Sequence, residues 1–242
     1  MAAPALLAQL QRDAEPKVSR ALITLLDAPE AIAVRPALRA WATEALAGSV
    51  EEAVKVQCVA VLDLAEDATV LLARLADAMP SVQAAACQRL YAGAPAQIAA
   101  DPGDPLARPD VPDAVRAACL EGAAQAWCGN AAGAAAAQAV LAREFAVTPR
   151  TPQRPAWRAI AALHCPARAV RGGKLPPWLA VLRDVVADPQ AGGFARTEAV
   201  RTLHALAAPK PWFVQWQRKY TAAQVGTDAM VRRALASVLH SP

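Results

Sequence analysis

Apolar residues recur along this chain at helical spacing, in short stretches separated by proline, glycine and acidic residues. One stretch begins at Val18 and includes Leu22 and Leu25, and others begin at Val54 and Val231. Positions three and four residues apart lie on the same face of an α-helix. Each stretch therefore predicts a short amphipathic helix with one apolar face.

Composition favours an all-helical fold. Hydrophobic residues make up 55% of the 242 residues, but aromatic residues only 5%, so much of the apolar content is alanine. Alanine has the highest helix propensity, and its small side chain lets helices approach closely. Since β-branched and aromatic residues are too thinly spread to favour strands, we expect an all-α protein.

A short pattern opens several of the predicted helices. An acidic or small residue is followed, two or three positions later, by a proline and then by an aliphatic residue, as in residues 13–22 and 77–86. Proline suits the first turn of a helix, where the N–H that it lacks would be unpaired. A preceding Asp or Ser can cap the free amides, and residues 49–52 form a capping-box sequence. The equivalent positions are 28 to 42 residues apart, which fits two short helices with their turns: Val18, Val54, Val82, Val115, Trp157, Ala195 and Val231.

These copies resemble the HEAT repeat family, and in particular the lyase-like HEAT repeats of bacteria. The resemblance rests on stretches such as residues 110–119 and 228–235 and extends over most of the chain. It implies one domain over residues 1–242, an α-α superhelix (solenoid) of about six to seven helix pairs whose inner helices line a concave face. Its expected parts are regular repeats (1–100), a proline-rich loop (101–112) and less regular, basic repeats (113–242).

Charge is divided unevenly between the two halves. Residues 1–121 contain 10 Lys and Arg against 16 Asp and Glu, whereas residues 122–242 contain 15 against 5. This asymmetry favours an acidic partner for the basic C-terminal half. Opposite charges at the two ends also favour head-to-tail self-association.

The segment from Lys210 to Tyr220 interleaves cations with aromatic residues. Trp212, Trp216 and Tyr220 are four residues apart and share one helical face, which is either part of the core or part of a binding patch. In the second case the cations would bind phosphate or carboxylate groups, for which arginine offers forked donors. The candidate binding residues are Arg154, Arg158, Arg196, Arg201, Trp212, Trp216, Arg218, Lys219, Arg232 and Arg233.

Some of these arginines have a structural alternative. Arg116, Arg158, Arg196 and Arg232 directly follow the opening apolar residue of their repeat. In the HEAT family, arginines at this position commonly pair with acidic turn residues of neighbouring repeats. The resemblance therefore allows either a binding role or a ladder of ion pairs for these four residues.

The sequence indicates neither catalysis nor metal binding. No histidine has a second metal ligand three or four residues away. The five cysteines lack a Cys-x-x-Cys pair, which predicts reduced thiols in a cytoplasmic protein, with Cys58, Cys87 and Cys119 as buried small hydrophobic residues. We expect no enzyme, no cofactor, no metal, no signal peptide and no membrane-spanning segment.

Three functions are compatible with these features. The leading hypothesis is a non-catalytic scaffold that binds another protein on its concave face. The alternative is a nucleic-acid-binding protein, because HEAT-like DNA glycosylases hold DNA in a cradle of basic helices and tryptophans. A third, by analogy with the bilin lyase-like repeats, is a factor that attaches a cofactor.

Overall fold

The computed structural model describes residues 3–12, 15–129, 133–147, 180–206, 208 and 210–239, and the regular elements in these ranges are all helical. The all-α fold expected from the sequence is therefore confirmed. The α-helices before residue 148 are α1 (Ala3–Arg12), α2 (Pro16–Leu26), α3 (Arg35–Ala47), α4 (Glu52–Val61), α5 (Ala68–Ala73), α6 (Pro80–Gly93), α7 (Pro95–Ala99), α8 (Asp113–Gly129) and α9 (Ala134–Val147). Those after residue 179 are α11 (Ala180–Ala187), α12 (Gly193–Ala205), α13 (Lys210–Tyr220) and α14 (Gly226–Leu239). Three short 3₁₀ helices connect them: η1 (Pro29–Val34), η2 (Arg74–Ala76) and η3 (Pro105–Ala107).

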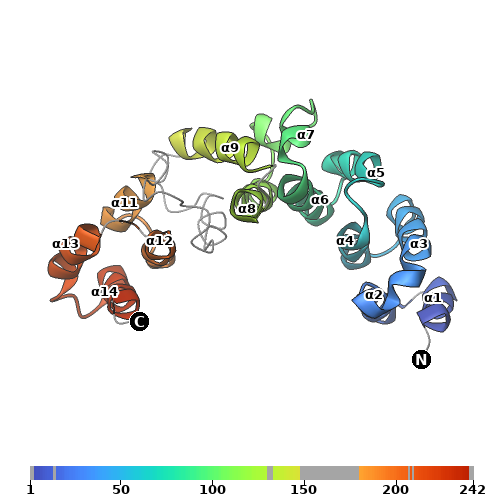
Figure 1. Cartoon of the computed structure of the whole chain (residues 1–242), viewed down its shortest axis with the longest axis horizontal. Helices are drawn as coiled ribbons and strands as arrows, with labels where there is room; N and C mark the ends of the chain where they lie inside the picture. The colour runs from blue at the N-terminus through green and yellow to red at the C-terminus, as the bar shows by residue number, and fades with distance from the viewer. Residues whose placement is uncertain are drawn as a thin grey trace.

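The helices before residue 148 form two layers along a curved row (Figure 1). The even-numbered helices α2, α4, α6 and α8 lie on the inner side of the curve, and each packs against the next. The odd-numbered helices lie on the outer side, where α3 packs on α4 and α9 packs on α8. After residue 179, α12 packs against α14, while α11 and α13 cover them.

The repeat pattern of the sequence marks the starts of the even-numbered helices. The third residue of α2, α4, α6, α8 and α12 is in each case an anchor of that pattern: Val18, Val54, Val82, Val115 and Ala195. All but the half-buried Val18 are buried, so their side chains attach these helices to the core. Val231 is also buried, within the second turn of α14, whereas Trp157 lies outside the described residues.

The predicted helix caps are wrong in detail. The N-cap residue of α4 is Glu51 rather than Ser49, and it makes no side-chain capping bond. Asp77 lies outside α6 and accepts a hydrogen bond from the amide of Met79 at 3.0 Å, which closes the turn before the helix. Proline in the first turn, by contrast, opens α2 and α6 as expected.

The helices α6 and α8 approach each other closely because small residues face each other between them. Ala86 and Ala123 are fully buried, and a Cβ added to Gly122 would lie 2.1 Å from the carbonyl oxygen of Gln88. Only glycine therefore fits at position 122 at this helix separation. The buried residues of the successive helices form one hydrophobic cluster.

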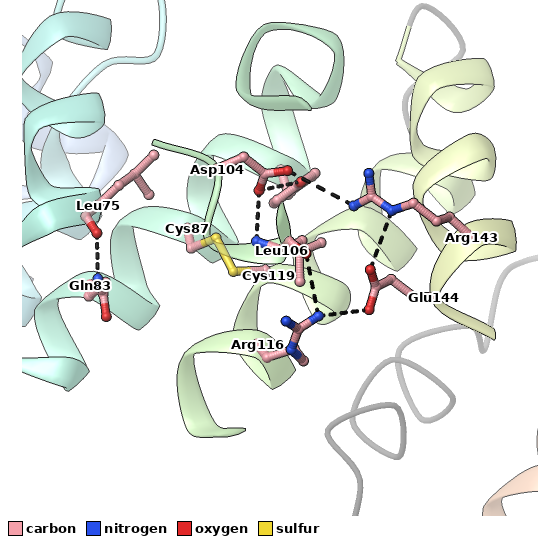
Figure 2. The surroundings of a disulfide bond; sticks show 10 residues. Leu75, Gln83, Cys87, Asp104, Leu106, Arg116, Cys119, Arg143 and Glu144 are labelled. Atoms are coloured by element: carbon pink, nitrogen blue, oxygen red, sulfur yellow. Dashed lines mark hydrogen bonds and ion pairs between the residues drawn. A yellow bond between two sulfur atoms is a disulfide. The ribbon is translucent and has the colours of Figure 1, made fainter. Parts of the chain in front are cut away.

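A disulfide between Cys87 and Cys119 joins α6 to α8 (Figure 2). Both cysteines are fully buried, as expected, but the prediction that they are reduced thiols is wrong. Their pairing depends on a helix contact across 32 residues of sequence, which spacing alone does not show. Because disulfides persist mainly in oxidising compartments, the reasoning behind the cytoplasmic expectation does not hold.

The proline-rich segment 101–112 is packed against the helices. Its Asp104 is buried and accepts hydrogen bonds from the Tyr91 hydroxyl at 2.8 Å and the Leu106 amide at 2.9 Å. Burial raises the pKa of Tyr91, so the phenol remains a proton donor to this carboxylate.

Among the helices described, none is long and apolar enough to cross a lipid bilayer.

Candidate functional site

The aromatic stripe of α13 belongs mainly to the core. Phe213, Trp216 and Tyr220 are buried, and Phe213 meets Trp216 edge to face with ring centroids 5.6 Å apart. Trp212 is half-buried, and the guanidinium of Arg183 lies over its ring at 5.0 Å. Of the two tryptophans expected in a binding patch, Trp216 is therefore turned away from the surface.

Arg196 is fully buried and so is not part of an exposed patch either. Its guanidinium forms an ion pair with Asp228 at 2.6 Å and donates hydrogen bonds to Thr227 and to the carbonyl of Val186. The same group lies over the ring of Tyr220 at 5.2 Å. Since Thr227 and Asp228 begin the next inner helix, Arg196 joins successive helix pairs, as the family-based alternative expects.

The remaining predicted cations lie on three helices. Arg201 of α12, Arg218 and Lys219 of α13 and Arg233 of α14 are exposed, although Arg201 also pairs with Glu198 at 2.7 Å. Arg232 is half-buried beside a hollow of about 170 Å³ between α13 and α14. Both Arg154 and Arg158 lie outside the described residues.

Several arginines bind the carbonyl end of a preceding helix, an arrangement that the sequence analysis missed. Arg74 donates to the carbonyl of Leu46 at the end of α3, and Arg89 donates to Leu62, the C-cap residue of α4. A cation placed there offsets the partial negative charge of the helix terminus and satisfies an unpaired carbonyl. The two pairs are separated by 28 and 27 residues, close to one repeat, and that spacing is the signal that could have revealed them.

Another arginine of this kind lies beside the disulfide (Figure 2). Arg116 donates to the carbonyl of Arg108 at 2.8 Å and forms an ion pair with Glu144 of α9 at 3.0 Å. It therefore ties the start of α8 both to the preceding segment and to its covering helix. This pairing gives Arg116 a structural role, although Glu144 lies within α9, which covers α8, and not in a turn of a neighbouring repeat as the resemblance implies.

The acidic half of the chain contains a similar junction. Arg39 of α3 donates two hydrogen bonds to Asp67, at 2.7 and 3.0 Å, and one to Glu66 at 2.8 Å. The Arg39 guanidinium lowers the pKa of Asp67, which therefore stays ionised well into acid. These bonds tie α3 to the turn that precedes α5.

A groove of about 490 Å³ opens between the inner helices α4 and α6. Its walls are mostly apolar, with Val56, Ala60, Ala85 and Ala92 among them. One cation, Arg89, and two glutamines, Gln88 of α6 and Gln125 of α8, also line it. None of these residues was among the sequence candidates, because apolar residues at helical spacing were interpreted as core.

The described residues offer little for covalent or metal chemistry. Within them no group of three or more His, Cys, Asp and Glu side chains could hold a metal ion. Burial raises the pKa of the Cys58 thiol to about 12, which keeps it protonated and unreactive at neutral pH. Comparisons with protein families, curated proteins and solved structures found no match for this chain.

Proposed function

We propose that this chain is a non-catalytic scaffold, built as a solenoid of HEAT-like helix pairs, that holds another protein on its inner helices. The side-by-side packing of α2, α4, α6 and α8 supports the solenoid. So do the arginine contacts that join residues about one repeat apart. Solenoids of this kind present extended concave surfaces suited to binding.

The observation that carries the proposal is the open groove between α4 and α6. An apolar surface hollow on stacked helices exposes carbon to water, and a partner that fills it gains the free energy of burying that surface. Its few polar groups would fix the partner's orientation. Nothing in the described groove provides a nucleophile paired with a base, so binding is the activity it supports.

The C-terminal helices supply the charge expected to meet an acidic partner. Arg218, Lys219 and Arg233 are exposed, and the helices that carry them have few acidic residues nearby. Such cations accelerate the encounter with an acidic surface and add specificity more than affinity. We therefore propose that the partner contacts the apolar groove with one part of its surface and the basic helices with another.

Nucleic acid remains the second candidate, favoured by the same exposed cations. Proteins that bind single strands also need aromatic rings on which bases can stack. Phe213, Trp216 and Tyr220 are buried, and Arg183 covers one face of the half-buried Trp212. Phe194 of α12 is an exposed ring on these helices, whereas the aromatic residues of α13 are buried or covered. The basic helices therefore offer phosphate contacts with little aromatic surface for stacking, which favours a protein partner.

Affinity capture from native lysate, with and without nuclease, tests this proposal. The scaffold predicts one protein recovered stoichiometrically after nuclease treatment, and weaker recovery with a variant carrying Arg218→Glu and Arg233→Glu. These exposed residues suit charge reversal, whereas reversal at the buried Arg196 would disrupt packing. Recovery of nucleic acid alone, lost as salt is raised, would instead establish the second candidate.

A further inference from the structure

Arg89 differs from the other arginines that bind a carbonyl at a helix end. Arg74, Arg116 and Arg196 each also hold a carboxylate, at 3.1, 3.0 and 2.6 Å respectively. Arg89 bonds to the carbonyl of Leu62 but forms no ion pair within the described part of the chain. Arg35 likewise binds only a carbonyl, that of Asp27, and is half-buried with an Nε that finds no hydrogen-bond partner among the described residues, but it does not line the groove between α4 and α6 as Arg89 does.

The surroundings of Arg89 make the absence of an ion pair energetically unfavourable. Its side chain is half-buried, and its Nε finds no hydrogen-bond partner among the described residues. Burial lowers the pKa of Arg89, because the charged form loses water that no adjacent anion replaces. Asp27, Asp63 and Asp67 act on it only at a distance, and Asp67 is already bonded to Arg39.

The groove places aliphatic surface next to this cation. Val56 and Ala60 of α4 and Ala85 and Ala92 of α6 form its walls around Arg89. A ligand that fills the groove would therefore meet apolar side chains and one unpaired guanidinium together. A carboxylate on such a ligand would form a charge-assisted hydrogen bond with Arg89. The apolar groups of the ligand would exclude water from this contact and so strengthen it.

We propose that the groove between α4 and α6 receives an aliphatic peptide segment of the partner protein that bears one carboxylate, which pairs with Arg89. Gln88 and Gln125 also line the groove, and their amides would bond to the backbone of the segment. This inference rests on the proposed scaffold function, since it names the part of the partner that the inner helices bind. A single carboxylate fits better than an acidic run, because the aspartates around Arg89 repel further negative charge.

Selection from a random-peptide phage library on the purified full chain tests the inference. Peptides enriched on the wild type should combine aliphatic residues with one Asp or Glu. Synthetic copies should bind about tenfold more weakly to Arg89→Gln, and replacement of the acidic residue by its amide should cause a similar loss. Ala60→Trp fills the groove from an exposed position of α4 and leaves the charge of Arg89 in place, and it should also abolish binding.

Two matched variants and a folding check control the experiment. Arg20→Gln removes an exposed arginine of α2, and Ala47→Trp adds an exposed ring at the end of α3; both should bind like the wild type. Circular dichroism and thermal unfolding must show that each variant folds. Selection of no peptides, of peptides without carboxylates, or of peptides indifferent to both Arg89→Gln and Ala60→Trp would overturn the inference.

The experiments distinguish a wrong peptide-site assignment for the groove from a wrong scaffold proposal. If Ala60→Trp and Arg89→Gln still capture the wild-type partner in full, the scaffold stands and the groove assignment is wrong. If the wild type captures no protein but the selected peptides bind as described, the groove is correct as a peptide site and the scaffold proposal fails.

Discussion

Gly122 determines how closely α6 and α8 pack. Gly122→Ala would place a Cβ 2.1 Å from a backbone oxygen of α6, so the two helices must separate. We expect it to lower the free energy of unfolding by about 2 kcal/mol or more, measured by urea denaturation. Gly129→Ala at the end of the same helix is the control, because its Cβ would meet nothing within 4 Å. A Gly122→Ala protein as stable as this control would show that the close approach is wrong.

Asp67 makes stability depend on pH. Its pKa is lowered in the folded state, chiefly by Arg39, and lies near 4 in the unfolded chain. The contribution of ionised Asp67 to the free energy of unfolding is therefore fully present above a pH of about 4. It is lost as the pH falls through the pKa that Asp67 has in the folded protein. Asp67→Asn should cost about 1–2 kcal/mol at pH 7 and progressively less in acid, measured by urea denaturation from pH 7 to 3. A cost that stays constant over this range would contradict the pairing, and the exposed Asp110→Asn should have no effect at any pH.

At the scale of the elements, the disulfide links two inner helices through cysteines that are 32 residues apart in the sequence. A cross-link over this length restricts the unfolded chain and stabilises the fold by about 4 kcal/mol. Replacement of Cys87 and Cys119 by alanine should therefore lower the free energy of unfolding by more than that amount, because two buried sulfur atoms are lost as well.

The control for this prediction is Cys58→Ala. Cys58 is a fully buried cysteine that the structure describes as free, so its replacement removes packing without removing a cross-link. It should cost about 1 kcal/mol. A double variant at Cys87 and Cys119 that loses no more than twice this amount would show that the cross-link contributes nothing.

The elements were predictable from sequence where their causes are local. Proline in the first turn and the spacing of Val54, Val82 and Val115 mark helix starts because both act within one helix. The arginine contacts, the Cys87–Cys119 pair and the true caps depend on neighbours about one repeat away. Such pairings follow from packing and not from the pattern within a single repeat.

The site was harder to predict than the fold. The valines and alanines of the groove, such as Val56 and Ala85, have the same spacing as core residues, and only the arrangement of α4, α6 and α8 leaves them open. Conversely, Trp216 and Arg196 belong to types that often bind partners, yet the structure buries both. Residue type therefore indicated a binding patch where the helices form core.

For the whole molecule, charge is distributed unevenly between the stretch before residue 148 and the stretch after residue 179. Acidic residues are concentrated around α3 to α5, where Arg39 binds two of them, while α12 to α14 expose arginine and lysine. Head-to-tail contact between the acidic N-terminal half and the basic C-terminal half of a second copy stays a prediction, for which α3 to α5 rather than α1 and α2 would supply the acidic surface. On the proposed scaffold function, a partner that spans the inner helices would meet both the groove and the basic helices.

The central claim is that a partner protein binds on the inner helices. Hydrogen–deuterium exchange of the chain, alone and with the captured partner, tests it most directly, because binding slows exchange where backbone is covered or stabilised. We expect new protection in α4, α6 and α8 around the groove and in α12 and α14, with α3, α5 and α9 unchanged. Protection confined to the outer helices, or no change on any helix, would contradict the account.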